Sequence, residues 1–241
     1  AAGVKRFLFS SSCSLYGAAG DAPVTEEAAY NPQTPYAESK VYAERDITQL
    51  ADDTFCPVFL RNATVFGISP RLRLDLVVQD LSMRGYLDGA ITILSDGTPW
   101  RPLVHIDDVS NAFVFLLEAP SDGVSAQAFN VGKQENNVQV HEIARMVQNA
   151  IPGTRVEIKN ENPSDTRSYR VDFSKLYALG FRPRYSLIDG VNEIVTAFRH
   201  AALSHHDRAD DHYITLTRYQ NLVARGLLDH ELRLSAINLA V

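Results

Sequence analysis

The sequence is poor in the residues that mark several common classes of protein. Only two of its 241 residues are cysteines, Cys13 and Cys56, and their spacing suits neither a disulfide framework nor a metal site. It contains no apolar run long enough to span a bilayer and no recognisable secretory signal. We therefore expect a cytoplasmic protein with reduced cysteines, no bound metal and no membrane contact.

Basic residues are in the minority as well. Lys and Arg number 23 against 29 Asp and Glu, which gives a net charge of -6 and a pI of about 5.6. The basic residues are scattered, which argues against a nucleic-acid-binding surface. With 45% hydrophobic and 22% charged residues, the chain can bury one large or two small cores. An anionic substrate would have to be bound by local arginines.

A glycine-rich turn between a strand and a helix is also missing. The early glycines are Gly3, Gly17 and Gly20, and none of them opens a helix directly after a strand. The backbone amides of such a turn receive the pyrophosphate of dinucleotide cofactors. The chain therefore lacks the usual sequence signal for binding a cofactor's pyrophosphate.

The most informative stretch covers residues 10–40. A short apolar run at residues 6–9 predicts a buried strand, and the hydroxyls of Ser10 and Ser12 follow it. In open α/β sheets, ligands bind outside the carboxyl ends of the strands. Tyr36 and Lys40 head a helical pattern and are four residues apart, so they share one helix face. This arrangement suits a tyrosine that acts as a base beside an ammonium group.

Strands and helices are predicted to alternate along the chain, as in an α/β protein. The predicted strands are residues 6–9, 56–61, 91–94, 100–106, 128–132 and 155–159. The predicted helices are residues 36–50, 72–85, 109–118, 141–150, 187–200 and 214–226. We expect the helix at 109–118 to be buried and capped by Asp107 or Asp108. Residues 204–212 are hydrophilic and predict a linker.

Five short blocks occur in a fixed order between residue 5 and about residue 200. They are Ser10-Ser11-Ser12 before Leu15-Tyr16-Gly17, the Tyr36-x-x-x-Lys40 pair, and residues 60–67, 101–109 and 129–132. In this order they resemble an extended short-chain dehydrogenase/reductase of the NAD-dependent sugar-nucleotide epimerase/dehydratase family. The resemblance implies the C-terminal part of a Rossmann-type parallel sheet with a smaller α/β substrate-binding lobe.

The resemblance also implies a domain organisation. The NAD-binding part would comprise residues 1–70 and 103–135, the lobe residues 71–102 and 136–203, and a helical extension residues 204–241. The resemblance starts about halfway through the nucleotide-binding domain, so we expect a fragment or a truncated product. Family members often pair through the Tyr/Lys helix, and we expect a homodimer.

The resemblance assigns the chemistry to a small set of residues. Tyr36 would remove a proton from a sugar hydroxyl while a hydride passes to NAD, which we expect rather than NADP. Ser12 would hydrogen-bond the same oxygen, and Lys40 would favour the phenolate and hold the nicotinamide ribose. The remaining cofactor-binding residues implied are Ser10, Ala63 and Val65.

The expected substrate is a nucleotide-diphosphate sugar. Arg101 and Arg167 would bind the diphosphate, because guanidinium groups match phosphate oxygens two at a time. Ser12, Ser14 and Thr64 would contact the sugar. Thr64 stands where many 4-epimerases have a substrate-binding asparagine, so the resemblance does not identify the hexose. Residues 87–94 would line the base and ribose or form plain core.

The residues after Ser12 bear on the type of reaction. The 4,6-dehydratases of the family carry an acid pair where this chain has Cys13 and Ser14. A 4-epimerase is therefore favoured, with a reductase, a dehydratase or a non-catalytic relative as alternatives. Cys13 would be a thiol acid/base for C3 or C5 epimerisation or a buried filler, and the filler is favoured because buried cysteines are usually inert.

Several other residues are better explained without a catalytic role. His105 has no acid or metal partner at a suitable spacing, which favours a structural histidine. His205, His206 and His212 lie in the hydrophilic stretch and are expected to be solvated. Trp100, beside Arg101, would either stack on a base or pack in the core.

Overall fold

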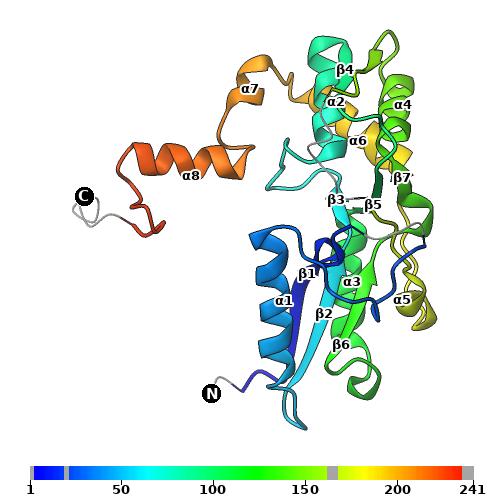
Figure 1. Ribbon diagram of the computed structural model, residues 1–241, viewed down its shortest axis with the longest axis vertical. Coiled ribbons are helices and arrows are strands. Elements are labelled where there is room, and N and C mark those ends of the chain that lie inside the picture. Colours follow the sequence, from blue (N-terminus) through cyan, green and yellow to red (C-terminus); the bar gives the residue numbers. More distant parts are fainter. Residues whose placement is uncertain (1–2, 19–21, 162–167, 235–241) are drawn as a thin grey trace.

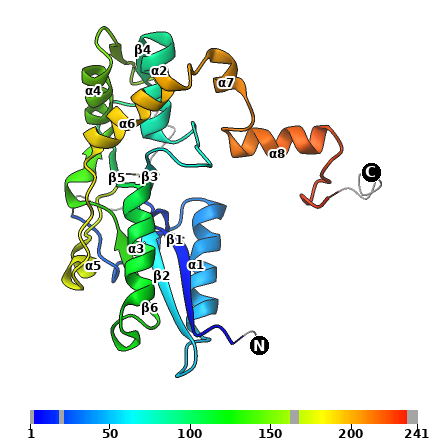
Figure 2. The ribbon, with the colours of Figure 1, turned by 180° about the vertical axis from the view of Figure 1, so that it is seen from behind.

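The computed structural model describes residues 3–18, 22–161 and 168–234 (Figures 1 and 2). The helices are α1 (Pro35–Thr48), α2 (Val77–Asp88), α3 (Ile106–Glu118), α4 (Val140–Ala150), α5 (Ser174–Ala178), α6 (Leu187–His200), α7 (His205–Ala209) and α8 (Thr215–Ala224). The strands are β1 (Arg6–Ser12), β2 (Cys56–Asn62), β3 (Thr64–Phe66), β4 (Ala90–Ile93), β5 (Trp100–His105), β6 (Gln127–Val131), β7 (Asn137–Gln139) and β8 (Arg155–Ile158). Short 3-10 turns lie at η1 (Cys13–Tyr16), η2 (Ser121–Gly123) and η3 (Gln134–Asn136). The predicted α/β class with parallel strand pairing is confirmed.

One parallel sheet has the strand order β1-β2-β6. The register pairs Arg6 with Cys56 and Ser12 with Asn62, so β1 and β2 end side by side. Helix α1 connects them, and α1 and α3 both contact these two strands. Because the strands are parallel, their carboxyl ends meet at one edge of the sheet. That edge carries the predicted hydroxyl groups.

The chain changes sheets immediately after β2. Strand β3 pairs in parallel with β5, β5 pairs antiparallel with β7, and β4 pairs in parallel with β8. One hydrophobic cluster includes buried residues of β2, β6 and α3, and a second includes buried residues of α2, α4 and α6. In Figure 1 these two groups of elements lie one above the other. The predicted domain boundaries stay a prediction.

Strand β1 differs from the prediction. The strand at residues 6–9 is present, but its expected burial is wrong, because Phe7 is 39% exposed and Arg6, Leu8 and Phe9 are only half-buried. Within the described residues β2 is the only strand that pairs with β1, so β1 is a sheet edge with less cover. The strand also continues to Ser12, which places the hydroxyl groups within it.

Two predicted helices also need correction. The helix expected from residue 72 begins at Val77, and a loop with a turn at residue 71 and bends at residues 74–76 precedes it. Helix α3 is not fully buried, since Val114 and Leu117 are each more than half exposed. Its cap is neither Asp107 nor Asp108, because the side chain of His105 accepts the Asp107 N–H.

The C-terminal part contains more helix than predicted. The expected linker at 204–212 includes α7, which begins with a capping box in which Ser204 and Asp207 bond each other's backbone N–H. Helix α8 ends before Gly226, as predicted, and extends away from the body of the molecule (Figure 1). No helix in the described part of the chain is long and apolar enough to cross a membrane.

Candidate functional site

Hydroxyl groups gather at the carboxyl ends of β1 and β2. The Ser10 Oγ accepts a hydrogen bond from the Asn62 side-chain amide at 3.0 Å. The Ser12 Oγ accepts the backbone N–H of Ser14 at 3.2 Å, which also caps η1. The hydrogen of the Ser12 hydroxyl therefore remains available for a ligand.

Helix α1 presents Tyr36 and Lys40 to the same edge. The helix begins there because Thr34 accepts the Ala37 N–H and Pro35 occupies the first turn. The Lys40 Nζ donates to the backbone carbonyl of Ser10 at 2.7 Å and lies 5.4 Å from the ring centre of Tyr36. Burial lowers the pKa of the Lys40 ammonium. The predicted Tyr/Lys pair is thus held against the end of β1.

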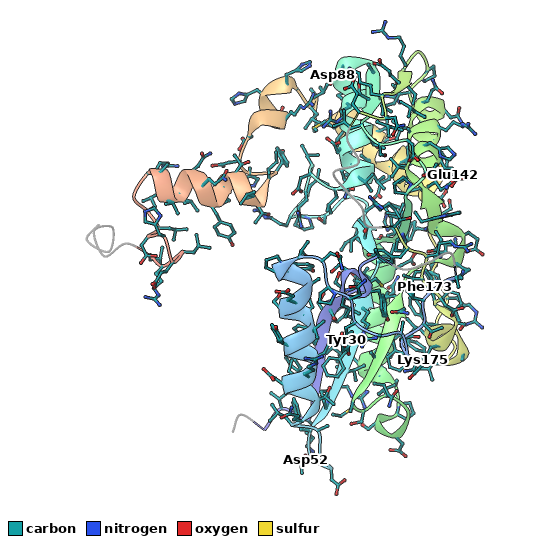
Figure 3. All side chains as sticks on the ribbon, viewed as in Figure 1. Tyr30, Asp52, Asp88, Glu142, Phe173 and Lys175 are labelled. Atoms are coloured by element: carbon teal, nitrogen blue, oxygen red, sulfur yellow. The ribbon has the colours of Figure 1, made fainter. Side chains whose placement is uncertain are left out.

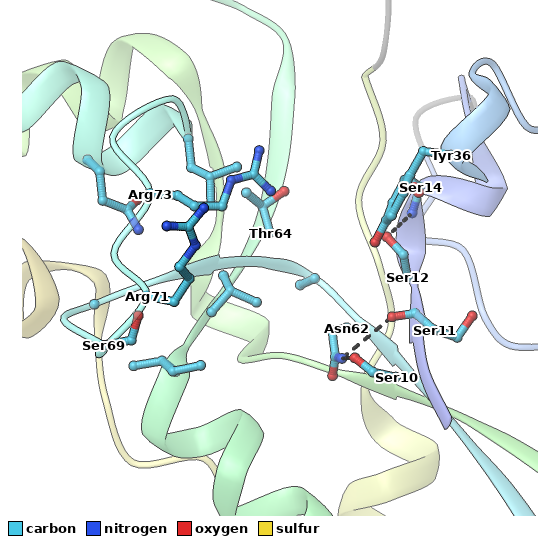
Figure 4. Close-up of a pocket in the computed structure, with 16 residues that line it drawn as sticks. Ser10, Ser11, Ser12, Ser14, Tyr36, Asn62, Thr64, Ser69, Arg71 and Arg73 are labelled. Carbon is cyan, nitrogen blue, oxygen red and sulfur yellow. Dashed lines mark hydrogen bonds between the residues drawn. The ribbon is translucent and has the colours of Figure 1, made fainter. Parts of the chain in front are cut away.

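A cavity of about 650 Å³, called the main cavity here, opens at this edge. Most of the predicted site residues line it, namely Ser10, Ser12, Ser14, Tyr36, Ala63, Thr64 and Val65. Figure 4 shows Ser12, Ser14 and Tyr36 on one side and Arg71 and Arg73 on the other. We call the first side the hydroxyl wall and residues 68–76 the arginine loop. No Asp or Glu is among the described residues that line the cavity.

Several buried polar atoms in the main cavity have no partner in the structure. They are the Ser14 Oγ, the Asn62 Oδ1 and the Gln79 Oε1. Buried polar groups are normally hydrogen-bonded, so unpartnered ones at a cavity indicate positions for ligand or solvent. The lining of the main cavity therefore has spare hydrogen-bonding capacity.

Arg101 lies outside the main cavity. It lines a second cavity of about 280 Å³ together with Thr92, Leu94 and Ser95. The adjacent residues Leu76 and Val77 line the main and the second cavity respectively, so the two cavities flank the start of α2. Arg101 is thus brought together with part of the stretch that the resemblance assigned to the nucleotide. Arg167 lies outside the described residues.

Cys13 does not line the main cavity. Its side chain is 1% exposed, and the Sγ lies 3.0 Å from the backbone carbonyl oxygen of Arg61. Burial raises the pKa of the Cys13 thiol, which keeps the sulfur protonated. These observations favour a packing role for Cys13 over a role as a catalytic acid or base.

A buried ion pair supports the hydroxyl wall from behind. The Glu44 carboxylate of α1 lies 2.7 Å from the Arg61 guanidinium of β2, and both side chains are 4% exposed. The Ser11 hydroxyl donates to the same carboxylate. Arg61 also donates to the Tyr16 and Tyr30 hydroxyl oxygens at 3.0 and 2.7 Å. The network therefore joins α1 to both strands whose ends form the site.

The arginine loop and the side-chain amides of Asn62 and Gln79 also contribute to the main cavity, and they were not predicted from the sequence. A usable signal was present, because apolar and polar residues alternate from Arg71 through Leu72 and Arg73 to Leu76. Such a period of two does not fit a helix, which is what we expected from residue 72 onward. In this bent loop Leu74 is buried, and the neighbouring Arg71 and Arg73 line the cavity.

His105 has an acidic partner after all. Its Nε2 lies 2.7 Å from a carboxylate oxygen of Glu193, which is 88 residues away in the sequence. Since its Nδ1 accepts the Asp107 N–H, the Nε2 carries the hydrogen and donates to Glu193. The absence of a partner was therefore a wrong expectation. The contacts of His105 cap α3 and tie it to α6, which is a structural role.

Known proteins of similar sequence cover most of the chain. The model of the NAD dependent epimerase/dehydratase family matches residues 1–132. A UDP-glucose 4-epimerase of Lactobacillus helveticus is 30% identical over 220 residues, which cover 82% of this chain and 64% of that protein. A dTDP-glucose 4,6-dehydratase of an Actinoplanes species is 28% identical over 203 residues, which cover 81% of this chain and 61% of that protein.

Solved structures share the fold. The structure of MoeE5 in complex with UDP-glucose and NAD is 30% identical, with a TM-score of 0.71, over 83% of this chain and 67% of that chain. The chain spans less than two thirds of the length of both curated relatives named above.

Proposed function

The chain belongs to the NAD-dependent epimerase/dehydratase family, and we propose that it forms the reaction side of an epimerase for a nucleotide-activated sugar. The proposed reaction passes through a transient 4-keto sugar. One observation carries the proposal: Ser12 and Tyr36 line one cavity, and Lys40 lies beside the Tyr36 ring. The family also contains dehydratases, so the type of reaction is argued from the site.

Tyr36 is suited to take the proton of a sugar hydroxyl. Its side chain is 56% exposed and lines the main cavity, so a substrate can reach the phenol oxygen. A phenol titrates near pH ~10 and needs a nearby positive charge to act as a base at neutral pH. The Lys40 ammonium supplies that charge. The free hydrogen of the Ser12 hydroxyl can be donated to the same substrate oxygen.

The residues present fit the nicotinamide side of NAD. Ser10 of β1, Ala63 directly after β2 and Val65 of β3 line the main cavity, and open α/β sheets bind ligands at the carboxyl ends of their strands. The unpartnered Asn62 Oδ1 supplies an acceptor beside them. When bound, NAD would accept a hydride from the sugar and return it. Lys40 and Tyr36 would hold the ribose in this proposal.

The site favours epimerisation over dehydration. Loss of water needs further proton transfers after the first oxidation. No carboxyl group is among the described residues that line the main cavity, and the Cys13 thiol is buried away from it. A 4-epimerase needs only one base and a cofactor that gives its hydride back.

The second cavity supports a nucleotide-diphosphate sugar as substrate. Arg101 and the neighbouring Thr92 and Leu94 offer a guanidinium and a lining for the nucleotide end. Thr64 lines the main cavity, and its contact with the sugar is part of the proposal. The contact of Arg167 with the diphosphate, the homodimer and the cytoplasmic location stay predictions.

The test is turnover of UDP-glucose by the chain with added NAD in D2O. We expect the C4 epimer without incorporated deuterium, because the hydride returns to the carbon that it left. Tyr36→Phe should lower the rate about 100-fold or more, with an unchanged unfolding midpoint. Tyr42→Phe is the matched control, since Tyr42 is a similarly exposed tyrosine on the same helix.

Other products of this experiment would identify the alternatives. Deuterium in the sugar would indicate dehydration or C3/C5 chemistry. Oxidation of added NADH or NADPH in proportion to product would indicate a reductase. A chain that binds UDP-glucose and NAD without turning them over would contradict the epimerase and leave a binding role.

A further inference from the structure

Residues 205–214, called the strap here, are attached to both ends of α2. At the C-terminal end of α2, one Asp88 oxygen lies 3.0 Å from the His205 Nε2 (Figure 3). The other Asp88 oxygen accepts a hydrogen bond from the Arg208 guanidinium at 2.7 Å. Helix α7 is therefore fixed beside Asp88. The strap lies outside the residues that the family model matches.

The second attachment of the strap is on the arginine loop. The backbone N–H of Leu74 donates to the Tyr213 carbonyl at 3.2 Å, and the Tyr213 side chain packs against the α2 cluster. The Arg71 guanidinium donates to the His212 carbonyl at 2.7 Å. Leu74 is 1% exposed, so its N–H needs a protein partner, and the strap supplies it.

Arg71 carries a charge that the described residues do not neutralise. Its guanidinium donates to a neutral carbonyl, and none of the described carboxylates pairs with it. Arg73, on the same loop, forms two hydrogen bonds with Asp75, at 3.0 and 2.7 Å. Both arginines line the main cavity opposite Tyr36 (Figure 4). The loop therefore presents one compensated and one uncompensated guanidinium.

We propose that Arg71 binds an oxyanion of the substrate and that the strap is the element that positions it. The proposal rests on the proposed function for its ligand, a nucleotide-diphosphate sugar. A free arginine side chain has many rotamers, and fixing them on binding weakens affinity. The His212 carbonyl restricts the Arg71 guanidinium beforehand while leaving other N–H groups free. Phosphate and carboxylate oxygens both match these donors.

Binding of UDP-glucose and UDP-glucuronic acid, measured by titration calorimetry, distinguishes the two anions. Arg71→Ala should weaken binding about 10- to 100-fold. An equal loss for both ligands would assign the diphosphate, and a loss confined to UDP-glucuronic acid would assign a sugar carboxylate. Arg73→Ala is the matched control and should weaken binding less than about threefold, because Asp75 already engages Arg73. Unchanged affinity in Arg71→Ala would overturn the proposal.

The positioning role is tested by loosening the strap. Tyr213→Ala should reproduce part of the Arg71→Ala loss, and the double variant should bind no more weakly than Arg71→Ala alone. Tyr213→Phe keeps the packing and should bind like the unaltered chain. Asp88→Asn weakens the attachment of the strap to the C-terminal end of α2 and should also weaken ligand binding. Additive losses in the double variant, or a Tyr213→Ala chain with lower stability but full affinity, would contradict a positioning role.

These measurements are independent of catalysis. Tyr36→Phe should bind both ligands, so the Arg71 series can be repeated in that background. If the epimerase proposal fails while Arg71→Ala still weakens binding, the strap proposal stands. If the unaltered chain binds neither ligand at millimolar concentration, the oxyanion site is excluded.

Discussion

The two sides of the main cavity are held in place in different ways. The hydroxyl wall rests on the Glu44–Arg61 pair, whose side chains are 4% exposed. The arginine loop is held by the strap, and the strap's anchor between Arg208 and Asp88 is about one-third exposed on both sides. Removing one partner of a buried ion pair strongly destabilises the folded protein, because the other charge stays buried without a partner. An exposed ion pair contributes little to stability.

The difference matches what each side would have to do. Proton transfer requires the base and its hydrogen-bonding partner to stay within a fraction of an ångström of the reacting oxygen. Ser12 and Tyr36 stand on elements that are joined by one buried network. Recognition of an anion tolerates small movements of a guanidinium. Under the proposed function, the hydroxyl wall would be the more firmly held side and the arginine loop the side that tolerates small movements.

The largest effect is expected from Glu44→Gln. The substitution keeps the side-chain shape but leaves the Arg61 charge buried without a carboxylate, which should lower the free energy of unfolding by about 3–5 kcal/mol. Urea unfolding at neutral pH measures the change. Glu38→Gln, on the exposed face of the same helix, is the control and should change stability by about 0.5 kcal/mol. Equal effects of the two variants would remove the contrast between the walls.

A smaller effect is expected from Gly67→Ala, at the residue directly before the arginine loop. Gly67 has a φ of +104°, and an added Cβ would lie 2.5 Å from the His105 Nε2. His105 cannot move aside easily, because it is buried between Glu193 and the stacked ring of Tyr185. We expect a loss of about 2–4 kcal/mol by urea unfolding and weaker binding of UDP-glucose.

Gly89→Ala separates backbone strain from the clash. Gly89 also has a positive φ, of +59°, but nothing lies within 4 Å of the position that an added Cβ would take. This variant should lose only about 1 kcal/mol and bind UDP-glucose normally. If Gly67→Ala lowered the free energy of unfolding no more than Gly89→Ala, the backbone at residue 67 could shift away from His105. The contact with His105 would then not fix the position of the arginine loop.

The hydroxyl wall could be predicted from the sequence because its signals are local. Ser10 and Ser12 end a strand, and Tyr36 and Lys40 lie one helical turn apart, so short spacings place all four at one edge. The resemblance to the epimerase/dehydratase family is confirmed by the family model. Local capping also determined the ends of α6, whose bounds agree with the predicted helix.

The arginine loop was not predicted because contacts between distant parts of the sequence hold it in place. Arg71 is held by the carbonyl of His212, which is 141 residues away in the sequence, and no local pattern points to that contact. Likewise, the partner of His105 is Glu193, on a helix near the end of the compact part. Hydrophobic periodicity could have shown that residues 71–76 are not helical. It could not have shown which cavity they reach.

The smallest effect concerns the strap and its dependence on pH. Burial acts to raise the pKa of Asp88, but hydrogen bonds from His205 and Arg208 outweigh it and hold that pKa below its usual value. The resulting stabilisation is present above the unfolded pKa of about 4 and is lost as the pH falls through the lower folded value. Because the pair is partly exposed, Asp88→Asn should lose at most about 1 kcal/mol at neutral pH.

The difference in unfolding free energy between Asp88→Asn and the unaltered chain should therefore shrink as the pH falls below about 4. It should also shrink in about 1 M NaCl, because salt screens exposed charges. The loss caused by Glu44→Gln should persist in salt, since that pair is buried. Asp53→Asn, which removes an exposed carboxylate far from the strap, is the control. An Asp88 effect that is insensitive to both pH and salt would mean that the strap is held by packing of Tyr213 rather than by charge.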